Sequence, residues 1–300
     1  MYKINLFDDI FSHQITSSDS QPTEFEYVKN QFNFDGITIY TDNHIKNNMV
    51  DKANSKINIG WLCESKSVMP YNIEFINSVV EKYDYIFTHD RRLIEMNPNK
   101  FLFVIPASWR KHFPDEHVNF YEDKNKLISF AFSNKRMTNG HNYRHQLSGI
   151  LGDRVDQMGT GTNNPFPQLE RVLAYKDYMF TLIVENDDYD YYFSEKIIEP
   201  FWAGTIPIYW GGSHDDTQIK KVFDINMDGI ITFNTTDELL KIFDSLSPEL
   251  YQTKLDAVKN NYEIFTDPIY RLGSEEYFYQ KYLYKFFTEG NLNNLISCVL

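Results

Sequence analysis

Short apolar segments recur along most of this 300-residue chain, and stretches with helical spacing of apolar residues separate them. The segments are rich in β-branched and aromatic residues and are bounded by polar or glycine-containing turns. Such alternation is typical of parallel sheets covered by helices, so the pattern predicts an α/β protein. The predicted strands are Gly36–Tyr40, Ile57–Leu62, Tyr85–Thr88, Phe101–Ile105, Leu127–Phe132, Arg154–Met158, Tyr178–Val184, Thr205–Trp210 and Gly229–Thr232.

The stretch around Tyr178–Val184 gives the most detailed prediction. This run is apolar at nearly every position, as expected for a strand that is buried on both faces. The polar residues Glu185–Asp190 cannot continue the strand and predict a loop. Ser194 is the predicted N-cap of a helix, and Thr205–Trp210 forms the next strand. In open parallel sheets ligands bind beyond the carboxyl ends of the strands, so we expect a ligand site at this loop.

The chain is long enough for two domains. The polar stretch Pro114–Lys126 separates apolar runs and predicts a linker. We therefore predict an N-terminal α/β domain over residues 1–124 and a C-terminal α/β domain over residues 125–270. A helix rich in Tyr and Phe is predicted within about residues 271–300.

Charge and cysteine content narrow the classes of function. The formal net charge is −13 and no run of three or more Lys or Arg residues occurs, which argues against a nucleic-acid partner. Two cysteines are too few for a disulfide framework. The sequence shows neither a signal peptide nor an apolar run of 18 residues, so we expect a cytoplasmic protein without a membrane span. Peripheral contact with a membrane stays compatible with this pattern.

Glu195 and Lys196 follow the predicted N-cap and are the first candidates for chemistry. An ammonium group at a helix N-terminus suits the neutralisation of a diphosphate, because the helix dipole adds positive charge there. Glu195 has the acceptor oxygens that ribose or sugar hydroxyls require. Taken alone, the dipeptide favours a solvated ion pair at a helix start, and the functional interpretation depends on the surrounding motif.

Asp188-Tyr189-Asp190 in the same loop has the D-x-D form by which metal-dependent glycosyltransferases bind Mn²⁺. Three residues of this kind recur often by chance, and Asp and Tyr are also common in ordinary turns. A metal-dependent glycosyltransferase that uses another nucleotide sugar is therefore an alternative interpretation.

The full motif resembles a known family. It consists of Glu185-Asn186, five further residues, Tyr192-Phe193-Ser194-Glu195-Lys196, and then Gly204-Thr205-Ile206-Pro207-Ile208-Tyr209-Trp210-Gly211. This ordered run is similar to the signature of the α-1,3-fucosyltransferases, family 10 of the glycosyltransferases. Fainter similarity extends upstream to about residue 57. The resemblance implies two Rossmann-like domains facing across a cleft, the GT-B architecture. If the two domains face each other in this way, the last helix, within about residues 271–300, is expected to cross back onto the first domain.

The resemblance also implies roles for individual residues. By analogy with the family, Asn186, Tyr192, Glu195 and Lys196 hold GDP-fucose, and Arg144 binds the diphosphate near the start of a helix. A guanidinium group can grip phosphate oxygens with two parallel hydrogen bonds. Glu64 corresponds to the catalytic glutamate, although Cys63-Glu64-Ser65 stands where relatives commonly have Gly-Glu-Asn.

We therefore predict an inverting glycosyltransferase that moves fucose, or a related 6-deoxyhexose, from a GDP-sugar to a saccharide or glycoconjugate hydroxyl. Glu64 is the predicted general base, and Arg144 and Lys196 are predicted to stabilise the departing diphosphate. No metal and no further cofactor are required in this scheme, because protein cations neutralise the charge. A second alternative is a protein that binds a sugar nucleotide or glycan without turnover.

Overall fold

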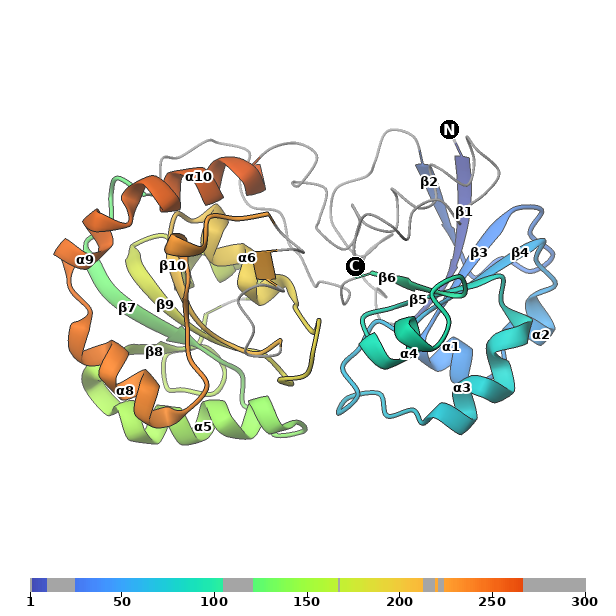
Figure 1. The fold of residues 1–300 in the computed structure, drawn as a ribbon, viewed down its shortest axis with the longest axis horizontal. Coiled ribbons are helices and arrows are strands. Elements are labelled where there is room, and N and C mark those ends of the chain that lie inside the picture. Colours follow the sequence, from blue (N-terminus) through green and yellow to red (C-terminus); the bar gives the residue numbers. More distant parts are fainter. Residues whose placement is uncertain are drawn as a thin grey trace. The chain divides into compact units, whose positions relative to one another are not determined.

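The structure, a computed structural model, describes residues 2–9, 25–104, 121–166, 168–212, 219–220 and 224–266 (Figure 1). These residues divide into two compact units, the first ending at Val104 and the second beginning at Tyr121. The predicted helix over residues 271–300 lies outside the described residues, and the predicted domain boundaries stay a prediction.

The first unit contains a parallel sheet of six strands, drawn in blue to teal in Figure 1. Their order in the sheet is β2-β1-β3-β4-β5-β6, and every neighbouring pair is parallel. The strands are β1 Tyr2–Phe7, β2 Phe25–Lys29, β3 Ile37–Thr41, β4 Ile57–Trp61, β5 Tyr85–Thr88 and β6 Phe101–Phe103. The short helices are α1 Asp42–Lys46, α2 Val50–Ala53, α3 Ile73–Val79 and α4 Arg91–Met96, with a 3₁₀ turn at Val80–Lys82.

The second unit contains a parallel sheet of five strands in the order β11-β10-β9-β7-β8. The strands are β7 Lys126–Ala131, β8 Asp156–Met158, β9 Tyr178–Val184, β10 Ile206–Trp210 and β11 Ile231–Thr232. The helices are α5 Asn139–Leu151, α6 Glu195–Trp202, α8 Thr236–Ser245, α9 Pro248–Thr253 and α10 Leu255–Thr266. Three 3₁₀ segments are η2 Gly152–Arg154, η3 Gln168–Ala174 and η4 Met227–Gly229.

The predicted strands from Gly36 onward all correspond to strands of the structure, and β9 is buried along most of its length as predicted. Ser194 caps α6, because its hydroxyl accepts a hydrogen bond from the Lys196 amide. Two strands of the first unit, β1 and β2, correspond to no predicted segment.

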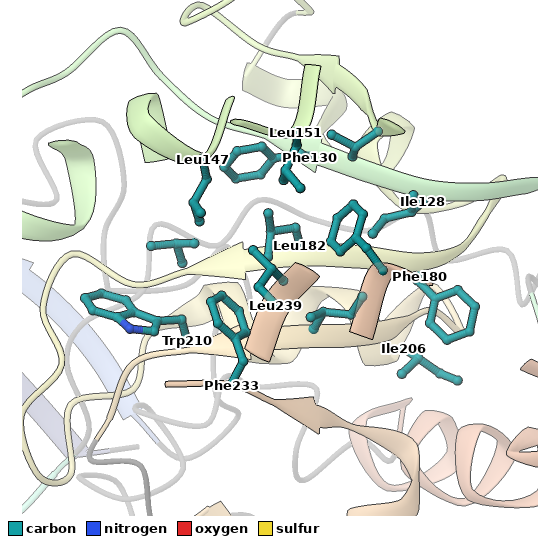
Figure 2. Close-up of a cluster of buried hydrophobic side chains, with 14 of the residues drawn as sticks. Ile128, Phe130, Leu147, Leu151, Phe180, Leu182, Ile206, Trp210, Phe233 and Leu239 are labelled. Atoms are coloured by element: carbon teal, nitrogen blue, oxygen red, sulfur yellow. The ribbon is translucent and has the colours of Figure 1, made fainter. Parts of the chain in front are cut away.

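A cluster of buried apolar side chains on one face of the sheet forms a core of the second unit (Figure 2). Phe130, Phe180, Leu182 and other apolar residues of β7, β9 and β10 pack there with helices α5, α8, α9 and α10. The helix contributions include Leu147, Leu151, Leu239, Tyr251 and Val258. Because burial of each such side chain stabilises the fold by about 1.5–3 kcal/mol, this core fixes the strand ends that carry the polar residues.

Close packing also joins the first turn of α5 to the end of β9. The Gly140 amide donates a hydrogen bond to the Asn186 carbonyl oxygen at 3.0 Å. A methyl group at Gly140 would lie 1.7 Å from the Glu185 carbonyl oxygen, so only glycine permits this approach. Gly149, on the same helix, faces open space instead.

These two glycines give a matched pair of variants. Gly140→Ala forces α5 away from the end of β9 and is expected to lower the melting temperature of the protein by several degrees. Gly149→Ala should be neutral or raise stability by about 0.5–1 kcal/mol, because alanine favours the helix at an open position. Thermal unfolding followed by circular dichroism tests both, and equal melting temperatures would contradict the packing described for Gly140.

Candidate active site

The topology of the second sheet defines where a ligand site is expected. In chain order its strands lie as 2-1-3-4-5, so the connections leave β7 and β9 in opposite directions at the point where these strands are neighbours. In doubly wound sheets the ligand crevice lies beyond the carboxyl ends of the strands at this switch point. Here β7 leads to α5, and β9 leads to the loop 185–194 before α6.

Arg144, on α5, reaches across to the end of β9. Its Nε donates to the Val184 carbonyl oxygen at 2.8 Å, and its Nη2 donates to that oxygen and to Asn186 Oδ1 at 2.9 Å. The side chain is buried, with 5% of the residue exposed, and burial lowers its pKa. Both partners are neutral, and no carboxylate among the described residues forms an ion pair with this guanidinium.

Glu185, the first residue after β9, has no role in the sequence-based prediction but is fully buried in the site. Its carboxylate accepts hydrogen bonds from the Ser194 amide at 2.9 Å, the Ser194 hydroxyl and the Tyr209 hydroxyl. This internal anion lies where the N-terminus of α6 was expected to meet a diphosphate. The signal in the sequence was an acidic residue directly after a strand that is buried on both faces.

Lys196 and Glu195 form an ion pair at the first turn of α6. Lys196 Nζ lies 3.1 Å from Glu195 Oε1 and 3.6 Å from Glu185 Oε2, and it donates to the Ser194 hydroxyl at 3.0 Å. Burial favours protonation of Glu195, but Lys196 and Arg171 outweigh it and lower the pKa of that carboxyl to about 2. The Glu195 side chain is only 6% exposed. The carboxylate of this ion pair is therefore buried, which excludes the solvated pair that the dipeptide alone allows.

Tyr192 and Asn186 complete the set predicted within the second unit. Tyr192 is buried, with its ring 5.1 Å from that of Tyr189, and it lies within electrostatic range of Arg144. Asn186 binds Arg144 directly. The structure thus brings the predicted donor-binding residues to one strand-end region of one unit.

The pKa of His141 reflects the electrostatic character of this region. Thr138 caps α5, and its hydroxyl is 2.8 Å from His141 Nδ1. Burial, followed by the charges of Arg144 and Lys196, lowers the pKa of His141 to about 4. The imidazole is therefore neutral at pH 7, and the surrounding cations make the region attractive to an anion.

Glu64 lies in the first unit, after β4. Its amide donates to Asp42 Oδ2 at 3.1 Å, and the Cys63 amide donates to Asp42 Oδ1 at 3.0 Å. Asp42 follows the neighbouring strand β3. Burial, together with the charge of Glu64, raises the pKa of Asp42 to about 8. Glu64 is half-buried and its backbone is fixed by this second carboxyl group.

The D-x-D residues contribute no metal cluster to the described part of the chain. Asp188 is exposed and Asp190 is partly exposed. Among residues 2–9, 25–104, 121–166, 168–212, 219–220 and 224–266, no group of three or more His, Cys, Asp or Glu side chains is arranged to hold a metal ion.

Comparison with known proteins agrees with the geometry. Residues 121–253 match the family model "Glycosyltransferase family 10 (fucosyltransferase) C-term". This segment, which makes up under half of the chain, is similar to family 10 of the glycosyltransferases. The resemblance seen in the sequence motif is thereby confirmed.

A viral protein provides a curated relative. "Putative fucosyltransferase R654" of Acanthamoeba polyphaga mimivirus is 30% identical over 159 residues, which cover 45% of this chain. The match spans 26% of the viral protein, so the chain matches about a quarter of that relative.

Solved structures share the fold. An α1,3-fucosyltransferase with GDP-fucose matches 88% of this chain and 89% of its own, with a TM-score of 0.55 at 15% identity. A mutant O-GlcNAc transferase of Thermobaculum terrenum matches 98% of this chain and 68% of its own, with a TM-score of 0.54 at 10% identity. The predicted fold class, α/β with two parallel sheets as in GT-B enzymes, is confirmed. None of the helices in the described residues has the length and apolar character that a membrane crossing requires.

His141 gives a direct measure of anion binding. Addition of GDP should raise its pKa from about 4, because the diphosphate offsets the positive charges of Arg144 and Lys196 that favour the neutral imidazole. The shift of the imidazole Cε1–H resonance with pH, measured by NMR with and without GDP, tests this. His89 of the first unit, whose pKa burial lowers to about 3, is the control and should not respond. Nucleotide binding with no change at His141 would place the diphosphate elsewhere.

Proposed function

We propose that this protein transfers fucose, or a related 6-deoxyhexose, from a GDP-sugar to a hydroxyl group of a saccharide, with inversion at the anomeric carbon. The observation that carries the proposal is the buried Arg144 guanidinium, which lies at the switch point between β7 and β9 with neutral partners only among the described residues. A shared fold with an α1,3-fucosyltransferase that was solved with GDP-fucose supports the choice of donor.

In this proposal positively charged, neutral polar and negatively charged side chains together bind the donor. Arg144 and Lys196 bind the diphosphate, which the acidic chain as a whole would otherwise repel. Asn186 helps to position the diphosphate. Its side-chain oxygen Oδ1 is fixed by a hydrogen bond from Arg144 Nη2 at 2.9 Å. Tyr192 lines this region, and the Glu195 carboxylate accepts a hydrogen bond from a hydroxyl of the donor.

Transfer proceeds in one displacement. Glu64 accepts the proton of the acceptor hydroxyl, and the resulting oxygen nucleophile attacks the anomeric carbon from the face opposite the diphosphate. The new bond forms as the bond from the anomeric carbon to the phosphate oxygen breaks, and its electron pair leaves with GDP. The products are the fucosylated saccharide, GDP and a proton on Glu64.

Arg144 and Lys196 act where charge develops. The leaving diphosphate gains negative charge in the transition state, and cations that are already fixed stabilise it without reorganisation. Arg144 is fixed by the Val184 carbonyl oxygen, and Lys196 is fixed by Ser194 and by the carboxylates of Glu185 and Glu195. In this scheme protein side chains supply the neutralising charge, and the donor GDP-sugar is the sole cosubstrate.

Removal of either cation tests this role. Arg144→Ala and Lys196→Ala should each lower kcat by roughly 10²- to 10³-fold, the usual loss when one transition-state donor is removed. Steady-state transfer of fucose from GDP-fucose, followed by GDP release, is the measurement. Arg154→Ala is the matched control, because Arg154 lies in the same unit but pairs with Asp244 at the surface. Turnover like that of the unmodified protein in both variants would contradict the assigned roles.

Glu64→Gln separates chemistry from donor binding. The variant should lose transfer while its affinity for GDP, measured by calorimetry, changes little, because Glu64 lies in the first unit. Glu74→Gln, at an exposed position of α3, is the control and should keep full activity. If Glu64→Gln abolishes GDP binding instead, Glu64 is a structural carboxylate.

The same assays separate the two alternatives. Complete loss of transfer with excess chelator, restored by Mn²⁺, would favour a metal site built on Asp188 and Asp190. Binding of GDP with neither transfer nor donor hydrolysis, over a panel of saccharide acceptors, would favour a protein that binds sugar nucleotides without turnover.

A further inference from the structure

Arg171 forms a buried bridge that neither the sequence motif nor the proposed reaction accounts for. It lies on η3, the segment that precedes β9, and its side chain is 20% exposed. Its Nη2 lies 3.3 Å from Glu195 Oε1 and 2.8 Å from Glu199 Oε2. One guanidinium thus joins η3 to two carboxylates that are four residues apart on α6.

The two carboxylates require this cation. The side chains of Glu195 and Glu199 are 6% and 2% exposed, and without a cation between them their charges would repel each other in a poorly solvated region. Tyr175, also on the segment before β9, donates its hydroxyl hydrogen to Glu199 Oε2 at 3.1 Å. Tyr175 and Arg171 therefore both contact Oε2 of Glu199.

The two cationic donors at Glu195 bind the same one of its two carboxylate oxygens. Arg171 Nη2 and Lys196 Nζ both donate to Oε1, at 3.3 Å and 3.1 Å, and neither donates to Oε2. Each carboxylate oxygen can accept about two hydrogen bonds, so Oε1 is filled and Oε2 keeps its capacity to accept. Because the two donors lie on different elements, they fix both the rotamer and the charge of Glu195.

We propose that Arg171 is a positioning residue for donor binding, which fixes the Glu195 carboxylate so that Oε2 accepts a hydrogen bond from a hydroxyl group of the sugar nucleotide. Glu199, which is itself held by Tyr175, orients Arg171 in turn. These contacts connect η3 to the first turn of α6. The proposal rests on the donor site proposed above and adds residues that do not touch the ligand.

The test compares GDP with GDP-fucose by calorimetry. Arg171→Met should weaken binding of GDP-fucose roughly 10-fold or more, as is typical when a residue that orients a ligand-binding group is lost. Arg171→Lys should recover only part of the affinity, because an ammonium group cannot bridge two carboxylates as a planar guanidinium does. Arg154→Met, at an exposed ion pair of the same unit, should bind as the unmodified protein does.

The measurement with GDP shows which hydroxyl group of the sugar nucleotide binds Oε2. An equal loss for GDP and GDP-fucose assigns Oε2 to the ribose, whereas a loss for GDP-fucose alone assigns it to the transferred sugar. Affinity for both ligands that matches the unmodified protein would overturn the role of Arg171, while absence of GDP binding by the unmodified protein would instead overturn the proposed function.

A double-mutant cycle distinguishes positioning from a general structural role. If Arg171 acts through Glu195, Arg171→Met should have no further effect on affinity when Glu195 is already Gln. If the two losses multiply, Arg171 acts by another route and the proposal fails. Where Arg171→Met unfolds the protein, the additional change Glu199→Gln removes the unbalanced buried charge, and the cycle is measured in that background.

Discussion

The rest of the site depends on the hydrogen bonds that Arg144 donates to two neutral oxygen atoms. A buried guanidinium requires partners for its donors, and the Val184 carbonyl oxygen and the Asn186 amide oxygen supply them without adding negative charge. The positive charge is therefore fixed in place and stays available to a ligand. Gly140 makes this geometry possible, because α5 can approach the end of β9 only without a side chain there.

Unlike Arg144, Lys196 has negatively charged partners. It lies among the carboxylates of Glu185 and Glu195, and Arg171 is a second cation that contacts the same oxygen of Glu195. Glu185 accepts a hydrogen bond from the Ser194 amide at the N-terminal end of α6. The charges around α6 are thus nearly balanced within the protein, so the field that favours an anion comes mainly from Arg144 with support from Lys196. The low pKa of His141 is consistent with this arrangement.

The sequence predicted the strands from β3 to β11 because their apolar runs are continuous and bounded by clear turns. It did not predict β1, where Asn5 interrupts the apolar pattern yet is fully buried. Its amide group bonds to Gln31 and to Thr38, partners that no local pattern reveals. The motif gave Asn186, Glu195 and Lys196 by resemblance. Arg171 was missed for the same reason as Asn5, since its importance depends on contacts between distant segments.

The first five strands of the first sheet are ordered as in the second sheet, but different titratable groups follow the strands at the two switch points. In the first unit Asp8, Asp42 and Glu64 follow three neighbouring strands, β1, β3 and β4, and the pKa of Asp42 is raised to about 8 by burial and by Glu64. In the second unit Arg144 and Lys196 follow β7 and β9. A carboxylate-rich edge suits the removal of a proton from a hydroxyl group, and a cation-rich edge suits a diphosphate leaving group. The proposed reaction, transfer of a sugar from a nucleotide to a hydroxyl, would use both edges, and in a chain with a net charge of −13 two cations at one strand end would supply the second.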